Sequence, residues 1–271
     1  MKTWKYLFGF LILATAAIWL AVFLSRDKNL HLVACDVGEG DAILATYKNF
    51  QILTDGGPNN KVLDCLAEYL PFWDKEIELV VLTHPDADHY RGLIEVLGRY
   101  RVDKFLTNGT EVSTSDYQVL RNWVGSKENI KEGVKIRAGK IRLDTLAPKI
   151  ITPDKTNENS IVTLLTFGSF KAVLTGDMVP AVGDALAQNW SFGHVNYIKV
   201  PHHGSKNGLT ENLLKALRPA VGIISVGKNN YGHPAQETLK ILSDYDIKIL
   251  RTDEAGDIEV VSDGSSFWIF H

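Results

Sequence analysis

The sequence is poor in cysteine. Only two cysteines, Cys35 and Cys65, occur among 271 residues, too few for a disulfide framework or for a zinc site built from thiolates. Cys35 lies in an apolar, strand-like run and Cys65 lies within a helical pattern, so we expect both to be buried thiols. Any metal ion would then be held by imidazole and carboxylate groups.

The sequence also has no excess of basic charge and no common nucleotide motif. The formal net charge is −3, which supplies no overall basic field for nucleic-acid phosphates, although a local patch or bound cations could still do so. Gly38 and Gly40 do not predict a phosphate-binding loop, because no helical pattern follows them. No Gly-x-Ser-x-Gly motif occurs either, which argues against covalent serine catalysis.

The amino-terminal segment is a long run without charge. Residues 7–24 contain no charged side chain, and a helix of this length rises roughly 27 Å, against about 30 Å for the hydrocarbon core of a bilayer. We therefore expect one uncleaved transmembrane helix, with residues 1–29 as anchor and linker and the body on the extracytoplasmic side of the cell membrane. A cleaved signal peptide and a buried core helix are the alternatives, but residues 23–27 make a poor cleavage site.

Residues 30–271 predict a single α/β domain. The chain is 45% hydrophobic and 23% charged, and we find no second linker and no repeat. Short apolar runs typical of strands, such as 31–37 and 79–83, alternate with helical patterns. Residues 161–167 and 170–175 predict a hairpin that turns at Gly168 and Ser169. This mixture suits sheets covered by helices on their outer faces.

A dense group of potential metal ligands follows the apolar run at 79–83. It consists of His84, Asp86, Asp88 and His89. Pro85 and the close polar spacing argue against a regular helix or strand there, so we expect a loop that folds several of these side chains around one point. A solvated surface loop is the alternative interpretation, but two histidines and two acids directly after a strand favour a metal site.

Three further motifs place polar residues after apolar strands. Asp177 could bind a metal or could be a turn or helix-capping residue. His202 and His203 are adjacent, and neighbours on an extended chain point opposite ways, so we expect only His203 to be a ligand. His202 could then contact substrate or be a core histidine. His233 is a site candidate, with a turn or capping residue as the alternative.

The segment from Thr83 to His89, followed by Gly92 and Leu93, resembles the His-x-His-x-Asp-His signature of the metallo-β-lactamase superfamily. It is most similar to the variant in the extracellular domain of ComEC competence proteins. Six other segments agree in order: residues 36–42, 53–57, 159–162, 174–177, 202–205 and 231–234. The resemblance implies an αββα four-layer sandwich with two divalent metal ions at one edge of the sheets, usually zinc and sometimes manganese.

The resemblance also implies the metal ligands, with Asp177 bridging the two ions. They are His84, Asp86 and Asp177 for the first ion, and Asp88, His89, Asp177 and His203 for the second. Asp86 stands where most relatives have a histidine, and Asn159 stands near where a third histidine is expected. The first site is therefore rich in oxygen ligands, which favours manganese more than an all-imidazole site would.

A two-metal site lowers the pKa of a bound water from about 15.7 toward about 7, so it predicts hydrolysis by a metal-activated hydroxide. The resemblance further implies that Asp88 contacts metal and nucleophile, that His202 or His233 holds the oxyanion or protonates the leaving group, and that Asp55 orients a ligand histidine. These two histidines and Lys206 suit a phosphoester or phosphodiester, small-molecule or nucleic-acid. The alternatives are a β-lactam or other amide or ester hydrolase, and a non-catalytic membrane-attached binding module with a degenerate metal site.

Overall fold

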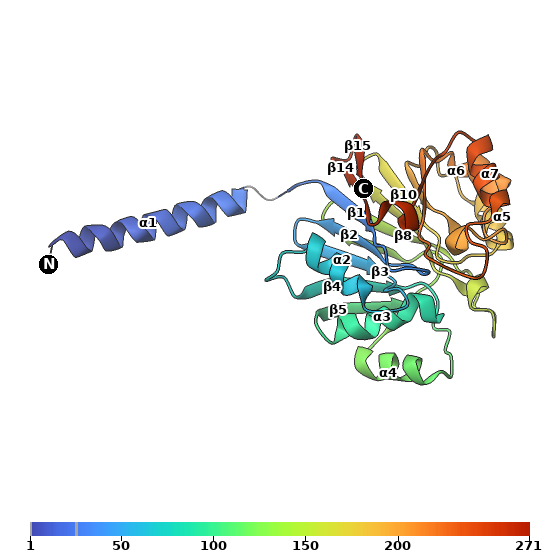
Figure 1. Ribbon diagram of the computed structural model, residues 1–271, viewed down its shortest axis with the longest axis horizontal. Coiled ribbons are helices and arrows are strands. Elements are labelled where there is room, and N and C mark those ends of the chain that lie inside the picture. Colours follow the sequence, from blue (N-terminus) through green and yellow to red (C-terminus); the bar gives the residue numbers. More distant parts are fainter. Residues whose placement is uncertain (1, 25–26) are drawn as a thin grey trace.

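The computed structural model describes residues 2–24 and 27–271. Helix α1 (Lys2–Leu24) extends away from a body that contains the strands (Figure 1). Among the described residues, no helix combines the length and the apolar character needed for a bilayer crossing, which takes about 20 consecutive, predominantly apolar residues. The prediction of a transmembrane anchor is therefore wrong, and so is the single-pass placement in the cell membrane that depended on it.

The first sheet of the body contains both the first and the last of the described strands along the chain. Its strands are β1 (Leu30–Ala34), β2 (Ile43–Tyr47), β3 (Phe50–Thr54), β4 (Glu76–Leu82), β5 (Arg101–Thr107), β6 (Glu128–Asn129), β14 (Ile258–Ser262) and β15 (Phe267–Phe270). They are ordered β15-β14-β1-β2-β3-β4-β5-β6. Strands β1 to β3 form an antiparallel meander, and β3, β4 and β5 pair in parallel.

The second sheet contains the predicted hairpin. Its strands are β7 (Lys135–Ala138), β8 (Ile141–Ala147), β9 (Val162–Phe167), β10 (Phe170–Leu174), β11 (Tyr197–Lys199), β12 (Val221–Ile224) and β13 (Lys248–Arg251). They are ordered β13-β12-β11-β10-β9-β8-β7. Phe167 pairs with Phe170 across the β9–β10 turn, where Gly168 has a φ of 61°, so the hairpin prediction is confirmed.

Helices cover the outer faces of the two sheets (Figure 1). The longer ones are α2 (Lys61–Tyr69), α3 (Ala87–Leu97) and α4 (Ser115–Val124) on the first sheet, and α5 (Pro180–Asn189), α6 (Glu211–Leu217) and α7 (Gln236–Asp244) on the second. A buried cluster joins the sheets, with Leu32 from the first beside Phe167 and Tyr197 from the second. The body therefore agrees with the predicted αββα four-layer sandwich.

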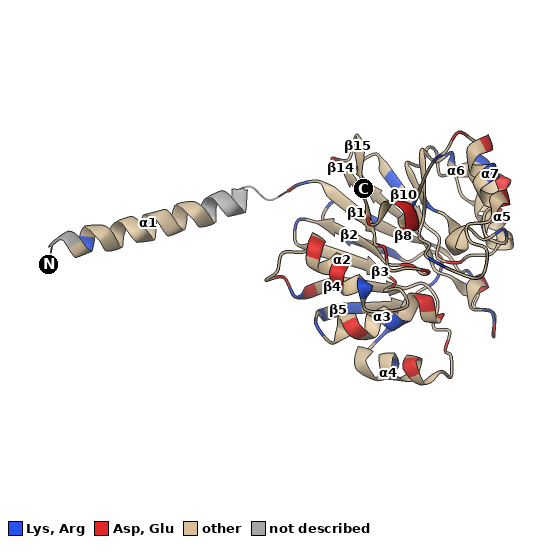
Figure 2. Ribbon diagram, in the orientation of Figure 1, with Lys and Arg blue, Asp and Glu red and all other residues tan. Residues whose placement is uncertain are grey.

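Acidic and basic residues are interspersed on most of the outer helices (Figure 2). Helix α7 shows the pattern, with Lys240 paired to Asp244 one turn later at 2.5 Å. Both side chains are exposed, and such pairs contribute only about 0.3–0.5 kcal/mol. The mixture agrees with the small formal net charge of −3.

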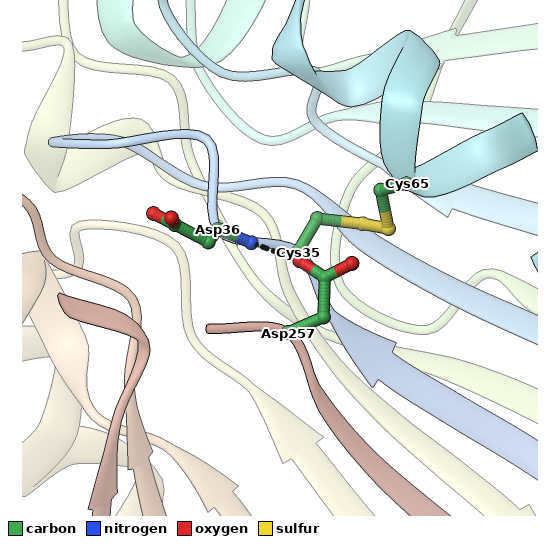
Figure 3. Close-up of a disulfide and its surroundings, with 4 residues drawn as sticks. All are labelled: Cys35, Asp36, Cys65 and Asp257. Atoms are coloured by element: carbon green, nitrogen blue, oxygen red, sulfur yellow. Dashed lines mark hydrogen bonds between the residues drawn. A yellow bond between two sulfur atoms is a disulfide. The ribbon is translucent and has the colours of Figure 1, made fainter. Parts of the chain in front are cut away.

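Cys35 and Cys65 form a disulfide (Figure 3). The expectation of two free buried thiols is therefore wrong. Cys35 directly follows β1 and Cys65 lies on α2, with 5.9 Å between their Cα atoms, a normal distance for such a bond. The two residues are 30 positions apart in the sequence, so only the packing of α2 on the first sheet brings them together.

Candidate metal centre

The predicted ligands after β4 do not lie in an irregular loop. Helix α3 begins at Ala87, and Asp86 occupies its N-cap position, so Asp88 and His89 belong to the first helical turn. The prediction missed this because Pro85 precedes the helix, where proline is compatible with a helix start. Gly92 lets α3 approach the loop after β3, since a Cβ there would lie 1.8 Å from the carbonyl oxygen of Gly56.

Four of the predicted ligands converge. Asp88, His89, Asp177 and His203 offer ligand atoms that all lie within 4.8 Å of one another. Nε2 of His89 is 3.4 Å from Oδ1 of Asp177, and Nε2 of His203 is 3.4 Å from its Oδ2. The first two residues belong to α3 beside the first sheet, whereas the other two follow β10 and β11 of the second. The cluster is therefore assembled from both halves of the sandwich.

The residues of the cluster fit a metal ion. Within the described part of the chain, Nε2 of His89 and His203 and Oδ1 of Asp177 are buried without a hydrogen-bond partner. Each unpaired buried polar atom costs roughly 1–3 kcal/mol, so their convergence indicates a shared ligand. Imidazole and carboxylate donors together suit a divalent cation such as zinc or manganese.

His84 and Asp86, the other two predicted ligands, lie beside this cluster. The His84 ring is buried, and its centroid is 4.1 Å from that of His89. Its Nε2 is 3.5 Å from Oδ2 of Asp86, a carboxylate that also accepts a hydrogen bond from the Thr156 hydroxyl. His84 and Asp86 thus offer one imidazole and one carboxylate to the predicted first ion, whereas the four-residue cluster offers a fuller set.

Asn159, which stands near the position expected for a third histidine, forms structural hydrogen bonds instead. Its Oδ1 accepts from the amide of Thr152 at 2.8 Å, and its Nδ2 donates to the carbonyl of Thr152 at 2.8 Å and to the hydroxyl of Thr110 at 3.1 Å. The side chain is buried, so these bonds occupy both of its polar atoms. Asn159 therefore does not complete the first metal position.

Asp55 contacts His89, one of the predicted ligands. Its Oδ2 is 2.9 Å from Nδ1 of His89, and the carboxylate also accepts from the amide and hydroxyl of Thr83. Because this contact occupies Nδ1, Nε2 of His89 is the ring nitrogen that faces the cluster. Such an arrangement fixes the tautomer of the ring and makes the imidazole a more basic ligand. Similarly, Nδ1 of His203 donates to the carbonyl of Ser225 at 2.9 Å.

Opposite charges shift the pKa values of the cluster. Burial opposes the charge of Asp177, but His203 and His89 hold its pKa well below the usual range. Burial also opposes the charge of Asp88, whose pKa the same two histidines lower. Against burial, Asp177 and Asp55 raise the pKa of His89, and Asp177 raises the pKa of His203 to about 10. A metal ion must compete with these protons for the imidazoles.

Lys199 is a buried residue that sequence reasoning missed. Its Nζ forms an ion pair with Asp41, donates to the carbonyl of Gly176 at 3.1 Å, and lies 3.6 Å from Oδ1 of Asp177. Burial disfavours its charge, but Asp41 and Asp177 raise the pKa of Lys199. It therefore places a fixed positive charge beneath the cluster. A lysine within the apolar run 195–200 is the signal that could have revealed it.

His202 and His203 have different surroundings, but not for the predicted reason. Both adopt left-handed backbone angles, with φ near 51°, in the short 3-10 turn Pro201–Gly204. The argument from strand alternation is therefore wrong. The turn separates the ring centroids by 6.1 Å and sets the rings at 85°. His203 enters the cluster, whereas His202 keeps 27% of its side chain exposed, with Nε2 3.7 Å from Oδ2 of Asp177.

His233 lies next to His202 at the edge of the cluster. Their ring centroids are 5.5 Å apart, and Nδ1 of His233 is 2.9 Å from Oε1 of Glu39. The exposed ring of Tyr231 stacks on the ring of His233, with 5.7 Å between the two centroids. Sequence reasoning identified His233 but missed Glu39, although Glu39 lies in one of the segments that carry the resemblance.

Comparison with known proteins matches the chain to one protein family. Residues 35–228 match the family model of the metallo-beta-lactamase superfamily. ComE operon protein 3 of Bacillus subtilis (strain 168) is 32% identical over 87% of this chain and 33% of its own length. Recombination protein 2 of Haemophilus influenzae is 27% identical over 83% of this chain and 28% of its own length. The chain thus spans about a third of the length of these curated relatives.

A solved structure supports the fold. The metallo-beta-lactamase fold protein YhfI from Bacillus subtilis superposes with a TM-score of 0.55, covering 90% of this chain and 100% of that one. The sequence identity is 15%, so this likeness concerns the fold alone.

Proposed function

Because the chain belongs to the metallo-β-lactamase superfamily, we propose that it is a metal-dependent hydrolase of phosphoester or phosphodiester bonds. The family and the hydrolase class predicted from the sequence are confirmed. The substrate class and the role of each residue are our proposal, argued from the contacts at the metal centre.

We assign Asp88, His89, Asp177 and His203 to hold the better-formed metal position, the second, with Asp177 shared with the first position at His84 and Asp86. These six residues are the ligands expected from the sequence. A divalent cation bound there supplies a Lewis acid and lowers the pKa of water. The Asp88 side chain is 33% exposed and turns Oδ2 toward His203, so we assign it to orient the attacking water and take its proton.

The observation that carries the phosphoester assignment is the pair of imidazoles outside the cluster. His202 and His233 lie side by side, and both are partly exposed. Their N–H groups can donate to the non-bridging oxygens of a phosphoester, and one of them can pass a proton to the leaving oxygen. A phosphoester offers two or more such acceptors on one centre, whereas a lactam offers a single carbonyl oxygen.

A nucleic-acid phosphodiester is one member of this substrate class. The relative named Recombination protein 2 supports it, and a small-molecule phosphoester satisfies the same donors. Two cations and the charge of Lys199 would supply the positive field that the net charge of −3 lacks.

The test is a metal-resolved assay of the full chain. Protein stripped by a chelator should regain hydrolysis of bis(p-nitrophenyl) phosphate with zinc or manganese and should leave a chromogenic lactam intact. Asp177→Asn should abolish turnover and lower the bound metal, whereas Asp244→Asn, an exposed carboxylate on α7, should change neither. Lactam cleavage without phosphodiester cleavage, or equal rates in Asp177→Asn and wild type, would contradict the proposal.

A further inference from the structure

Glu39 connects the two halves of the site at its edge. It lies in the segment between β1 and β2 of the first sheet and reaches the segment after β12 of the second. Its Oε2 accepts a hydrogen bond from the amide of Gly227 at 3.1 Å, and its Oε1 is 2.9 Å from Nδ1 of His233. Both side chains of this ion pair are mostly buried. One carboxylate thus contacts two groups of the opposite segment.

The surrounding backbone leaves Glu39 and His233 little freedom. A Cβ at Gly227 would lie 2.5 Å from the amide nitrogen of Glu39, so only glycine permits this approach. On the other side, Oδ1 of Asn229 accepts from the amides of Tyr231 and His233 at 3.0 and 3.1 Å. The backbone of Glu39 is therefore packed against Gly227, and the backbone of His233 is held by Asn229, which limits where the carboxylate and the imidazole can lie.

We propose that Glu39 is a positioning residue that fixes the tautomer and orientation of His233 for proton transfer to the leaving group. This inference rests on the proposed function. A carboxylate only accepts, so the pairing places a proton on Nδ1 of His233 and leaves Nε2 as the atom that exchanges the second proton. The ring of Tyr231 stacks on the ring of His233, and the ring of His202 lies alongside. Nε2 is then the nitrogen presented to substrate.

The proton balance is simple. As the bond from water oxygen to phosphorus forms, the water proton goes to Asp88. As the bond from phosphorus to the leaving oxygen breaks, the Nε2 proton of protonated His233 goes to that oxygen, and the ring stays bonded to Glu39 through Nδ1. Solvent then returns the proton from Asp88 to His233, which restores the starting state.

The activity test compares leaving groups. Glu39→Gln keeps the size of the side chain and an oxygen for the amide of Gly227, but it presents an amide N–H to the His233 ring. We expect kcat to fall about 10–100-fold for a phenyl phosphodiester, whose leaving group needs a proton, and far less for a p-nitrophenyl phosphodiester. Bound metal should not change. Glu237→Gln, an exposed glutamate on α7, is the matched control and should affect neither substrate.

A spectroscopic test separates this inference from the proposed function. Histidine ¹⁵N–¹H spectra of the full chain, assigned with His233→Gln, should show the neutral ring of His233 protonated at Nδ1 in the wild type and at Nε2 in Glu39→Gln, whatever the substrate. Loss of activity on both phosphodiesters alike, or an Nδ1 proton that persists in Glu39→Gln, would overturn the positioning role. If the tautomer differs between the wild type and Glu39→Gln as expected but the wild type has no phosphodiesterase activity, only the proposed function is overturned.

Discussion

At the scale of single residues, neighbouring side chains of the same chemistry have separate tasks. His203 donates from Nδ1 to a backbone carbonyl and turns Nε2 into the cluster, whereas His202 remains partly exposed beside it. The left-handed turn that contains both residues produces this difference. A substitution at one position should therefore have consequences that a substitution at the other does not.

We predict that His203→Ala releases metal, because water replaces a lost imidazole poorly in a site with few protein ligands. His202→Ala should keep its metal and lower turnover by less than the roughly 10²–10⁴-fold of a lost general acid or base, because we assign the proton transfers to Asp88 and His233 and leave His202 to hold a phosphoryl oxygen. Metal analysis beside single-turnover rates measures both effects. The assignments are reversed if His202→Ala loses the metal while His203→Ala retains it.

A second residue-scale prediction concerns Asp257, whose carboxylate accepts from the amide of Asp36 at 2.6 Å (Figure 3). Burial and the charges of Glu68 and Asp36 raise the pKa of Asp257. The folded state therefore binds this proton more tightly than the unfolded chain, and stability falls as pH rises through the raised pKa. Asp257→Asn keeps the acceptor and removes the charge.

Asp257→Asn should raise the midpoint of thermal unfolding by roughly 1–3 °C at pH 7 and should give no gain near pH 3, where the carboxyl is protonated in both states. Scanning calorimetry at both pH values measures this. Asp263→Asn is the control, because hydrogen bonds to the backbone of Ser266 and Ser265 lower the pKa of Asp263. Asp263→Asn should not raise the midpoint of thermal unfolding at pH 7. A gain for Asp257→Asn that is equal at both pH values would show that charge is not the cause.

At the scale of elements, the disulfide fastens α2 to the end of β1, next to the segment that carries Glu39 and Asp41. The bond closes a loop with a sequence separation of 30. In the chain-entropy model a loop of this length contributes about 3–4 kcal/mol to stability. The helix packs by its apolar face, with Val62 and Leu66 buried, so the bond adds to a contact that already exists.

We predict that reduction lowers the free energy of unfolding by about 3 kcal/mol. Urea titrations with and without reductant measure the difference. A variant with both Cys35→Ala and Cys65→Ala should show the lower stability in both conditions, since it has no bond to reduce. Identical stability of the wild type with and without reductant would contradict a structural role for the disulfide.

At the scale of the whole molecule, the metal centre lies where the two halves of the sandwich meet. His89 is supplied by the first half, and Asp177 and His203 are supplied by the second. A cation that binds all three connects elements distant in the sequence. It also neutralises carboxylates whose charge is now opposed by burial. Binding should therefore stabilise the body as a unit.

Zinc or manganese at about 100 times its Kd should stabilise the fold by about 2.7 kcal/mol, equivalent to roughly 5–10 °C in the midpoint for a body of this size. Thermal unfolding with added metal and with a chelator measures the shift. Asp177→Asn should respond much less. A midpoint that is the same in metal and in chelator would contradict a metal site at this position.

Several parts of the site were predictable from local sequence. Asp88 and His89 stand together in a motif whose residue types predict a metal site. Asp177, which could also be a capping residue, and His203 joined them in one ligand set through the resemblance to the metallo-β-lactamase superfamily. Lys199 and Glu39 were not found. Each looks ordinary in its own segment and acquires a role only through a partner more than a hundred residues away, Asp41 and His233 respectively.

The sequence by itself determined the mixture of strands and helices and the chemistry of the predicted ligands, because apolar periodicity and donor type are local properties of the chain; the four-layer sandwich was expected from the resemblance to the metallo-β-lactamase superfamily. Only the tertiary structure decided how those groups are arranged. It joined Cys35 to Cys65, placed Asp88 and His89 in a helical turn, and turned His202 away from His203. These outcomes depend on which segments pack together and on backbone angles within a few residues. Contacts of this kind join segments that are distant in the sequence, and neither segment by itself indicates its partner.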